Sequence, residues 1–391
     1  ANLNLLITMS TFGGTLQEYD RISIDNFTQH NLKSTVFLLS HCHKDHMNGL
    51  NSQPFLGRLQ SRSDIKLYLS EVSCTLLLND PEYENLRPYT VTIPVDCPTT
   101  IKVPSDNSKP AYNVVVTLIS AEHCPGSTMF YLEGLQGNVL YTGDFRLSGS
   151  ERQLEALYDE GGSPKPLKCA YVDTTFCFPG ANYIPCRLDC SEALVNLVKP
   201  IVAETDCNIL LQTFTQYGYE HLYKVLWHTF GMKVHVAEGK MNRYIGLESI
   251  QEAMTLDANS TRFHASSGYY HCHCPLLNCI TIRPSAMWFV NHVSVNDLVE
   301  RIGQNNYRLC YSMHASLTEV RGLLEKLQPE RVCANVKLDG WDVVKLVEPS
   351  SVCKRSKMDY GDSSSVPLNG EQKPNLVWSY WSSDESDATS D

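Results

Sequence analysis

The stretch His41-Cys42-His43-Lys44-Asp45-His46 decides the fold class, because it places four metal-binding side chains within six residues. It directly follows residues 35–39, an apolar run that predicts a buried strand ending at the motif. In a tight loop after a strand, the first two histidines can point to one metal ion, while the aspartate and the last histidine point to a second. Neutral imidazoles and carboxylates that leave coordination positions open are typical ligands of a zinc hydrolase. The hexapeptide therefore predicts one half of a two-metal hydrolytic site.

The same order of apolar run and polar residue recurs further along the chain. These repeats are residues 114–119 before His123, residues 139–142 before Asp144 and residues 170–172 before Asp173. Taken alone, His123 would be an ordinary loop histidine and Asp144 a turn residue after a glycine. Their shared position at strand ends instead predicts that His123 completes the first metal site and that Asp144 bridges the two sites.

Two carboxylates and one histidine are candidates for supporting roles. Asp25 and Asp173 look like ordinary carboxylates at strand ends, but a metal site needs such acceptors to orient its imidazoles, and both are suitably placed. His314 lies between an apolar segment and the start of a helix. By position alone, it is either a site residue or a histidine that flanks the helix.

Composition bounds the class of protein. The chain has 391 residues, of which 42% are hydrophobic and 19% charged, as expected for a soluble globular protein of two domains. Its 15 cysteines are an odd number, so reduced thiols fit better than a complete disulfide framework. The net charge of −11 argues against binding nucleic acid by bulk electrostatics but permits a local basic groove. No apolar run reaches the roughly 18 residues of a membrane span, so we expect no membrane partner.

The second half of the chain changes to mixed helix and strand. The apolar spacing predicts a helix over residues 192–199 that ends at Pro200, and another over residues 219–230 that a glycine closes. Ser316 followed by Glu319 predicts a capping box at the start of a third helix.

A second cluster of histidines and cysteines follows in this half. His235, His264, Cys272 and Cys274 could together close a structural zinc site. Their spacing matches no standard zinc finger, so an unligated, solvent-facing loop rich in His and Cys is an equal alternative.

Several basic residues could line a path for phosphates. Among them, Lys44, Arg146 and Arg283 are the candidate DNA contacts. Most basic side chains belong simply to a solvated face, and that alternative stays open for each.

Together these motifs resemble those of the beta-CASP branch of the metallo-beta-lactamase family, which acts on nucleic acids. The matching stretches are Ser23-Ile24-Asp25, the opening hexapeptide, His123-Cys124-Pro125-Gly126-Ser127, Tyr141-Thr142-Gly143-Asp144-Phe145-Arg146 and Asp173-Thr174-Thr175-Phe176. Residues 216–220, 234–236 and 284–289 are further similar to nucleases of this branch that open DNA hairpins and trim ends in non-homologous end joining and V(D)J recombination.

The resemblance implies a role for each site residue. It assigns His41, His43 and His123 to the first metal ion, Asp45 and His46 to the second, and Asp144 to both. It makes Asp25 a partner of the ligands, Asp173 an acid near the metals and His314 the last catalytic-site histidine. The implied cofactors are one or two catalytic Zn²⁺ ions, with Mg²⁺ possible in activity, and a second, structural Zn²⁺.

The resemblance also implies the architecture. The expected fold is α/β, a four-layer αββα sandwich interrupted by an inserted α/β beta-CASP domain. The sandwich domain would comprise residues 9–163 and 311–349, and the insert residues 164–310. The composition of residues 350–391, rich in Ser, Asp, Gly and Pro, predicts a disordered acidic tail.

One position departs from the pattern of the branch. Where the first cysteine of the structural zinc site is expected, the chain has Ser266, and a serine hydroxyl is a poor zinc ligand. Cys272 and Cys274 either restore the site with another spacing or the site is lost. The implied partners are DNA hairpins, overhangs and single-stranded ends, a DNA-dependent protein kinase and a DNA ligase. The short tail leaves docking of the two proteins open. We expect a nuclear monomer.

These observations favour a DNA endonuclease with 5′ to 3′ exonuclease capacity. One alternative is a 5′-phosphate-dependent 5′ to 3′ DNA exonuclease in crosslink repair or telomere processing. Others are a thioester or lactam hydrolase and a non-catalytic scaffold that binds DNA ends. RNA also stays open as a substrate, because groove shape cannot be read from sequence.

Overall fold

The computed structural model describes residues 10–106, 108–147, 149, 151–267, 279–290, 297–338 and 340–347. The predicted zinc ligands Cys272 and Cys274 and the predicted tail 350–391 lie outside the described residues.

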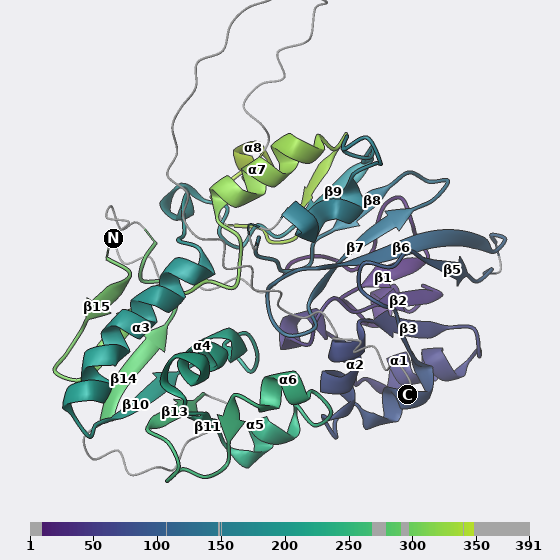
Figure 1. Ribbon diagram of the computed structural model, residues 1–391. Coiled ribbons are helices and arrows are strands. Elements are labelled where there is room, and N and C mark those ends of the chain that lie inside the picture. Colours follow the sequence, from purple (N-terminus) through teal and green to yellow (C-terminus); the bar gives the residue numbers. More distant parts are fainter. Residues whose placement is uncertain are drawn as a thin grey trace, which may run out of the picture. The chain divides into compact units, whose positions relative to one another are not determined.

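The strands of the first half of the chain, together with β17, form two sheets (Figure 1). The four-stranded sheet has the order β1-β2-β3-β4, and all its strands are parallel. Its strands are β1 Ile22–Ile24, β2 Val36–Leu38, β3 Lys66–Leu69 and β4 Thr90–Thr92. The six-stranded sheet has the order β17-β9-β8-β7-β6-β5, in which β8, β9 and β17 are parallel. Its strands are β5 Thr99–Val103, β6 Tyr112–Ser120, β7 Thr128–Glu133, β8 Val139–Tyr141, β9 Cys169–Val172 and β17 Val332–Ala334.

A core of alternating strand residues joins the two sheets. Ile22, Ile24 and Leu38 of the four-stranded sheet share one hydrophobic cluster with Tyr141 and Tyr171 of the six-stranded sheet. Alternate residues of a strand face opposite sides of the sheet, so the remaining strand residues cover the outer faces. The two sheets therefore pack face to face.

Helices cover both outer faces of this sandwich. On one side, Phe55 of α1 (Gln53–Gln60) packs against the rings of Phe27 and Phe37 beside the four-stranded sheet. On the other side, α7 (Leu317–Leu327) and α8 (Val343–Val347) lie next to β17 and β9 (Figure 1). The predicted four-layer αββα order is confirmed.

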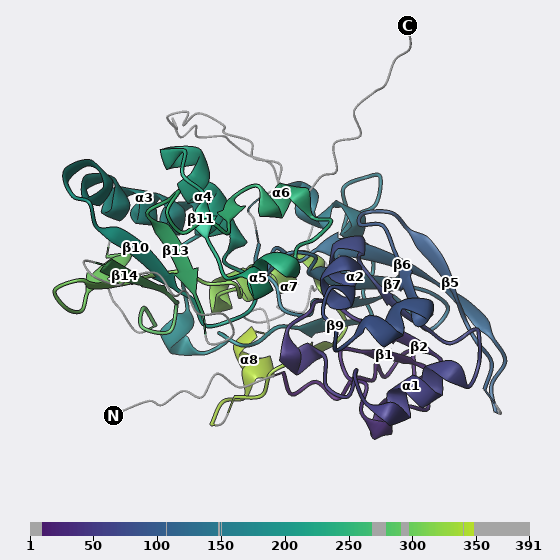
Figure 2. The same cartoon turned by 90° about the horizontal axis from the view of Figure 1, so that it is seen from below.

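A seven-stranded sheet lies between β9 and β17 in the sequence. Its order is β12-β11-β13-β10-β14-β16-β15, and only β15 is antiparallel to its neighbour. Its strands are β10 Asn208–Gln212, β11 Val234–His235, β12 Met254–Thr255, β13 Phe263–Ser266, β14 Cys279–Pro284, β15 Val299–Arg301 and β16 Asn306–Leu309. The helices α3 (Arg187–Glu204) and α4 (Glu220–Phe230) lie beside it, as Figure 2 shows. The predicted inserted α/β unit is thus present.

Short helices complete the described chain. These are α2 Glu71–Leu78, α5 Glu238–Asn242, α6 Glu248–Gln251, η1 Gln29–Asn31, η2 Lys44–His46, η3 Glu84–Tyr89, η4 Glu151–Leu157 and η5 Pro179–Ala181. Among the described residues, no helix combines the length and apolar character needed to cross a membrane.

Of two predictions about helix ends, one is confirmed and the other was wrong. The capping box of Ser316 and Glu319 is confirmed, with both reciprocal hydrogen bonds present at the start of α7. The prediction that Pro200 ends its helix was wrong, because α3 continues to Glu204 with Pro200 inside it. A proline removes one hydrogen bond donor, and the packing of the buried Leu194 and Val198 keeps the last turn helical nonetheless.

The domain boundaries stay a prediction. β9 lies after residue 164 but pairs with β8 and β17 in the six-stranded sheet. We therefore propose that the insert begins after Val172, and not at residue 164.

Candidate metal centre

The candidate ligands lie at one edge of the sandwich, where several strands end. Asp25 follows β1, the hexapeptide follows β2, and Asp144 and Asp173 follow β8 and β9. A main-chain hydrogen bond of 3.0 Å from Thr128 N to Ser40 O joins the two sheets at this edge. The carboxyl ends of parallel strands meet at a common edge, so short apolar runs deliver polar side chains to one place.

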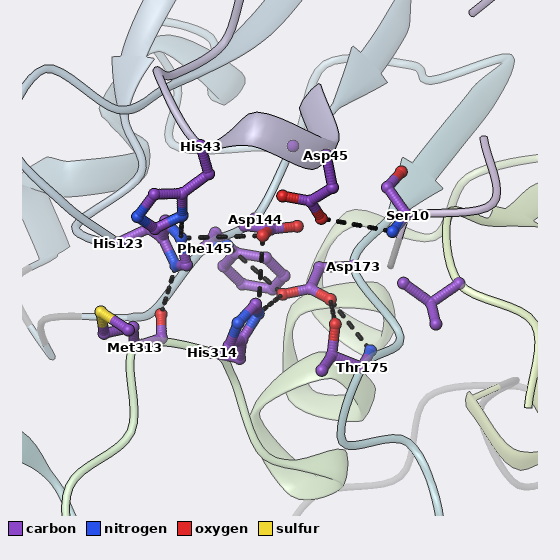
Figure 3. A network of polar contacts seen from close by, with 12 residues as sticks. Ser10, His43, Asp45, His123, Asp144, Phe145, Asp173, Thr175, Met313 and His314 are labelled. Carbon is purple, nitrogen blue, oxygen red and sulfur yellow. Dashed lines mark hydrogen bonds and ion pairs between the residues drawn. The ribbon is translucent and has the colours of Figure 1, made fainter. Parts of the chain in front are cut away.

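The first group of candidate ligands is His41, His43, His123 and Asp144. One ligand atom from each lies within 4.8 Å of the others. The Nε2 atoms of His41 and His123 are 3.7 and 3.6 Å from Asp144 Oδ2. His43 Nδ1 is 3.0 Å from His123 Nε2. Figure 3 shows His43 and His123 next to Asp144.

The second group is Asp45, His46 and Asp144. His46 Nε2 lies 3.3 Å from Asp144 Oδ1 and 3.6 Å from Asp45 Oδ2. Asp144 therefore turns Oδ2 toward the first group and Oδ1 toward the second. This is the arrangement that a carboxylate shared by two metal ions requires.

Asp25 holds the imidazoles on the sandwich side. Its carboxylate accepts hydrogen bonds from His46 Nδ1 (2.8 Å), Tyr141 Oη (2.9 Å), Ser40 N (2.7 Å) and Ser40 Oγ (2.5 Å). Because the Ser40 hydroxyl proton goes to Asp25, Ser40 Oγ can accept from His41 Nδ1, 3.0 Å away. Both rings therefore carry their proton on Nδ1 and turn a bare Nε2 toward the candidate metal site.

Two main-chain carbonyls hold the other imidazoles. His43 Nε2 lies 3.3 Å from Tyr217 O, and His123 Nδ1 lies 3.0 Å from Met313 O. A carbonyl oxygen can only accept, so each histidine donates its proton there. Tyr217 follows β10 in the inserted unit, and Met313 follows β16, where the chain returns to the sandwich, so the insert and the segment after it each orient one candidate ligand.

These residues fit a metal ion. His41 Nε2 and His46 Nε2 are buried and have no hydrogen bond partner within the described residues. Buried polar atoms without a partner are costly. The facing nitrogens of His43 and His123, each deprotonated by the tautomer argument, would repel at 3.0 Å unless a cation lay beside them. Imidazole and carboxylate donors with these tautomers suit a divalent transition metal.

The pKa shifts agree with neutral ligands in the first group. Burial, followed by the neighbouring imidazoles, holds the pKa of His41 and of His123 well below the usual value. In the second group, burial lowers the pKa of His46, but Asp144 and Asp25 outweigh it and raise that pKa. A metal ion held by His46 and Asp144 would compete with the additional proton of His46 and displace it.

His314 and Asp173 form a pair beside Asp144. His314 Nδ1 donates to Asp173 Oδ2 at 2.9 Å and lies 3.9 Å from Asp144 Oδ2 (Figure 3). Burial lowers the pKa of His314, but Asp173 and Asp144 outweigh it and raise the pKa to about 9. Thr175 N and Oγ1 donate to the other oxygen of Asp173 and fix its orientation.

Comparison with known proteins gives the family. Residues 248–340 match the family described as DNA repair metallo-beta-lactamase. The chain is 36% identical to Protein artemis of Mus musculus over 356 residues, 87% of this chain and 50% of the relative. Its identity to Protein artemis of Homo sapiens is also 36% over 356 residues, 87% of this chain and 51% of the relative. The chain belongs to the DNA repair metallo-beta-lactamase family. The resemblance to the beta-CASP branch is confirmed.

A further relative, 5' exonuclease Apollo, has a lower sequence identity to this chain. The chain is 29% identical to 5' exonuclease Apollo of Rattus norvegicus over 224 residues, 57% of this chain and 39% of the relative. This chain spans about half the length of the artemis proteins that it matches.

The structure corrects one predicted DNA contact of this metallo-beta-lactamase. Arg146 is only 2% exposed, and its guanidinium donates to Glu319 Oε1 and to the carbonyls of His314, Ile184 and Pro185. These bonds hold the helix α7 and the return segment, residues 310–316 between β16 and α7, against the sandwich. The prediction that Arg146 contacts a DNA phosphate was therefore wrong, because its hydrogen bond donors are used inside the protein.

The other two basic candidates keep exposed side chains. Lys44 Nζ forms an ion pair of 2.8 Å with Glu82 and lies 3.1 Å from Tyr83 Oη. Arg283 is exposed and donates from Nε to Gln212 Oε1 at 2.6 Å. Both stay proposed DNA contacts.

The histidines of the predicted structural zinc site lie on neighbouring strands. His235 in β11 pairs with His264 in β13, and their Nδ1 atoms are 3.1 Å apart. Ser266, at the end of β13, accepts hydrogen bonds from Thr213 through its main-chain oxygen. The remaining predicted ligands lie outside the described residues, so the structural zinc site stays a proposal.

Sequence reasoning named Asp25 and Asp173 as partners of the imidazoles in this metallo-beta-lactamase but missed Ser40, Tyr217 and Met313. Ser40 could have been found, since a hydroxyl directly before His41 can serve as an acceptor. Tyr217 and Met313 act through main-chain oxygens, which every residue carries, so their side chains give no signal for this role.

Proposed function

We propose that the chain is a metal-dependent DNA nuclease that opens hairpins and trims overhangs, with 5′ to 3′ exonuclease capacity. The observation that carries this proposal is the convergence of the two ligand groups on the two oxygens of Asp144. The similarity to the artemis proteins supports a DNA substrate and a role in double-strand break repair by non-homologous end joining and V(D)J recombination.

The metal in this proposal is zinc. His41, His43, His123 and Asp144 would hold one ion, and Asp45, His46 and Asp144 a second, with Mg²⁺ able to serve in activity. Bound ions of this kind supply Lewis acidity, which activates water and offsets the charge that develops on a phosphodiester.

The protein's own groups have separate tasks in the proposed reaction. Asp25 and Ser40 keep the protons of His41 and His46 on Nδ1, so the ligand atoms stay bare. Asp173 holds a proton on His314 Nδ1, and the raised pKa of this imidazole supports a role as donor to the leaving oxygen of DNA.

The similarity to 5' exonuclease Apollo supports a second candidate, a 5′-phosphate-dependent DNA exonuclease in crosslink repair or telomere processing. The two candidates share the metal centre and differ in the substrate end that they require. Comparing a DNA hairpin with 5′-phosphorylated single-stranded DNA separates them. Hairpin opening supports the first, and strict dependence on the 5′ phosphate supports the second.

The test of metal-dependent nuclease activity uses the same substrates with zinc or magnesium. We expect His41→Ala to abolish cleavage and His30→Ala, a change at an exposed histidine of η1, to leave it unchanged. Faster turnover of a thioester or lactam than of DNA would instead favour a small-molecule hydrolase. DNA binding without metal or cleavage would favour a scaffold.

Further proposals concern the setting of the protein. We propose a nuclear monomer that acts with a DNA-dependent protein kinase and a DNA ligase, as the family resemblance implies. His235 and His264, together with Cys272 and Cys274, are the proposed ligands of a structural zinc. Zinc content of purified protein before and after His264→Ala tests that site.

A further inference from the structure

A buried polar network surrounds the loop that contacts His43. The loop Gln216-Tyr217-Gly218 follows β10, and its three carbonyls and the Gly218 N–H all have polar partners. Gln216 O accepts from Lys240 Nζ at 2.7 Å, and Gly218 O accepts from Tyr311 Oη at 3.0 Å. Gly218 N donates to Glu220 Oε2 at 2.6 Å. The loop carbonyl between these anchors, Tyr217 O, is the one that faces His43.

Glu220 is the centre of this network. Its carboxylate lies at the start of α4 and is 1% exposed. Besides Gly218 N, it accepts hydrogen bonds from Lys240 Nζ at 3.3 Å and from Tyr244 Oη. Lys240, also buried, links the same carboxylate to Gln216 O. A buried carboxylate with four acceptor positions can organise several donors in one geometry.

Contacts between aromatic rings connect this polar network to the imidazole of His43. The rings of His43 and Tyr217 are stacked, with centroids 6.3 Å apart and an interplanar angle of 20°. The Tyr217 ring in turn meets the ring of Tyr244 edge-on at 6.0 Å. Gly218 also lies close to the Met313 side chain, since a Cβ atom at this position would be 1.8 Å from Met313 Sδ.

We propose that Glu220, with Lys240 and Tyr244, is a positioning unit that sets His43 as a ligand through the carbonyl of Tyr217. The inference rests on the proposed metal centre and deepens it. Glu220 touches no candidate ligand. It fixes the acceptor that keeps the His43 proton on Nε2, which leaves Nδ1 for the metal ion.

The unit has a direct consequence for metal affinity. Partners that orient a ligating histidine typically contribute about 10- to 100-fold to metal affinity. Glu220→Gln removes the charge and turns an amide toward the Lys240 ammonium, so Gly218 and Gln216 lose their fixed positions. We expect zinc affinity to fall about 10- to 100-fold, with the change confined to the ion that His43 binds.

The experiment measures zinc affinity of the full chain by chelator competition and follows histidine ring nitrogens by ¹⁵N NMR of the zinc-loaded protein. In the wild type, His43 should show a slowly exchanging Nε2 proton and a metal-bound Nδ1. In Glu220→Gln, that proton should exchange faster. A merely structural role of Glu220 would leave the signals of His43 and His41 equally affected.

Two hydroxyl variants serve as a matched pair in case Glu220→Gln does not fold. Tyr244→Phe removes a donor to Glu220, whereas Tyr223→Phe removes a buried hydroxyl of α4 that is not among the described donors to Glu220. We expect only Tyr244→Phe to lower zinc affinity. Folded variants with wild-type affinity and wild-type His43 signals would overturn the positioning role alone. A wild-type protein without zinc affinity would overturn the metal centre and this role together.

Discussion

At the scale of single residues, the centre depends on where each imidazole keeps its proton. Asp25 collects donors from Ser40, His46 and Tyr141, and it does so from a left-handed backbone conformation with φ of 55°. That conformation is rare for a residue with a side chain and is kept where surrounding contacts enforce it. The carboxylate is therefore placed for its hydrogen bonds, at a cost to the local backbone.

Replacing this carboxylate with an amide tests its role. Asp25→Asn keeps the size of the side chain but turns one acceptor into a donor, which conflicts with the Nδ1 proton of His46. We expect metal affinity to fall about 10- to 100-fold, measured by chelator competition. Tyr141→Phe, which removes only one of the donors, should have a smaller effect. Equal affinity in Asp25→Asn and wild type would contradict the assigned role.

A histidine away from the centre links stability to pH. Burial lowers the pKa of His221 from 6.5 to about 3. Its Nε2 proton goes to Ser191 Oγ at 2.9 Å, since the Ser191 hydroxyl itself donates to Arg187 O. The unfolded chain binds a proton here below pH 6.5, while the folded chain stays neutral down to about pH 3. The contribution of His221 to the free energy of unfolding therefore falls as the pH drops through this window, by at most about 1.4 kcal/mol per pH unit.

The pH effect is measurable by urea denaturation with a chelator present, so that metal release does not contribute. We expect His221→Gln to lose less stability between pH 6.5 and 4 than the wild type, whose His221 has the shifted pKa. His30→Gln, at an exposed position, should follow the wild type. Parallel curves for wild type and His221→Gln would show that this side chain does not carry the effect.

At the scale of elements, the turn between β8 and Asp144 brings the two sheets together. Gly143 has a φ of 54°, and a Cβ atom there would lie 2.9 Å from Ser40 Oγ. The absence of a side chain thus lets β8 approach the residue that links His41 to Asp25.

Adding one methyl group tests this turn. Gly143→Ala should lower the free energy of unfolding by about 1 kcal/mol or more from backbone strain. It should also weaken metal binding, because Ser40 must move. Gly322→Ala adds the same methyl group within α7, where open space surrounds the position, and should stabilise the protein by about 1 kcal/mol. Denaturation and chelator competition on both variants separate strain from the effect on the centre.

At the scale of the whole molecule, the family resemblance implied the layers, whereas the pattern of apolar runs followed by polar residues indicated the candidate ligands. Asp144 and Asp173 follow the neighbouring parallel strands β8 and β9, so they meet at one edge of the six-stranded sheet. His41 follows β2 of the other sheet, so its approach to them depends on how the two sheets pack. Contacts between residues far apart in the sequence could not be predicted from these patterns. The burial of Arg146 depends on Glu319 in α7, far away in sequence, and the carbonyl partners of His43 and His123 have no residue signature.

Metal removal should weaken the whole fold. An ion that binds only the folded state adds about 2.7 kcal/mol of stability when its free concentration is about 100 times Kd. We expect a chelator to lower the melting temperature of the wild type and of His30→Ala. In His41→Ala the chelator should have a smaller effect, because a ligand of the first group is gone. An equal chelator effect in both variants would contradict the ligand assignment.

The carbonyl partners of the histidines also set an order in time. The partner of His43 lies 174 positions later in the chain, and that of His123 lies 190 positions later. During synthesis, the hexapeptide therefore leaves the ribosome long before the groups that orient it exist. If the centre binds metal as proposed, stable uptake should wait until the return segment at Met313 has been made. Occupancy of the centre would then report that the chain has been synthesised and folded through the insert.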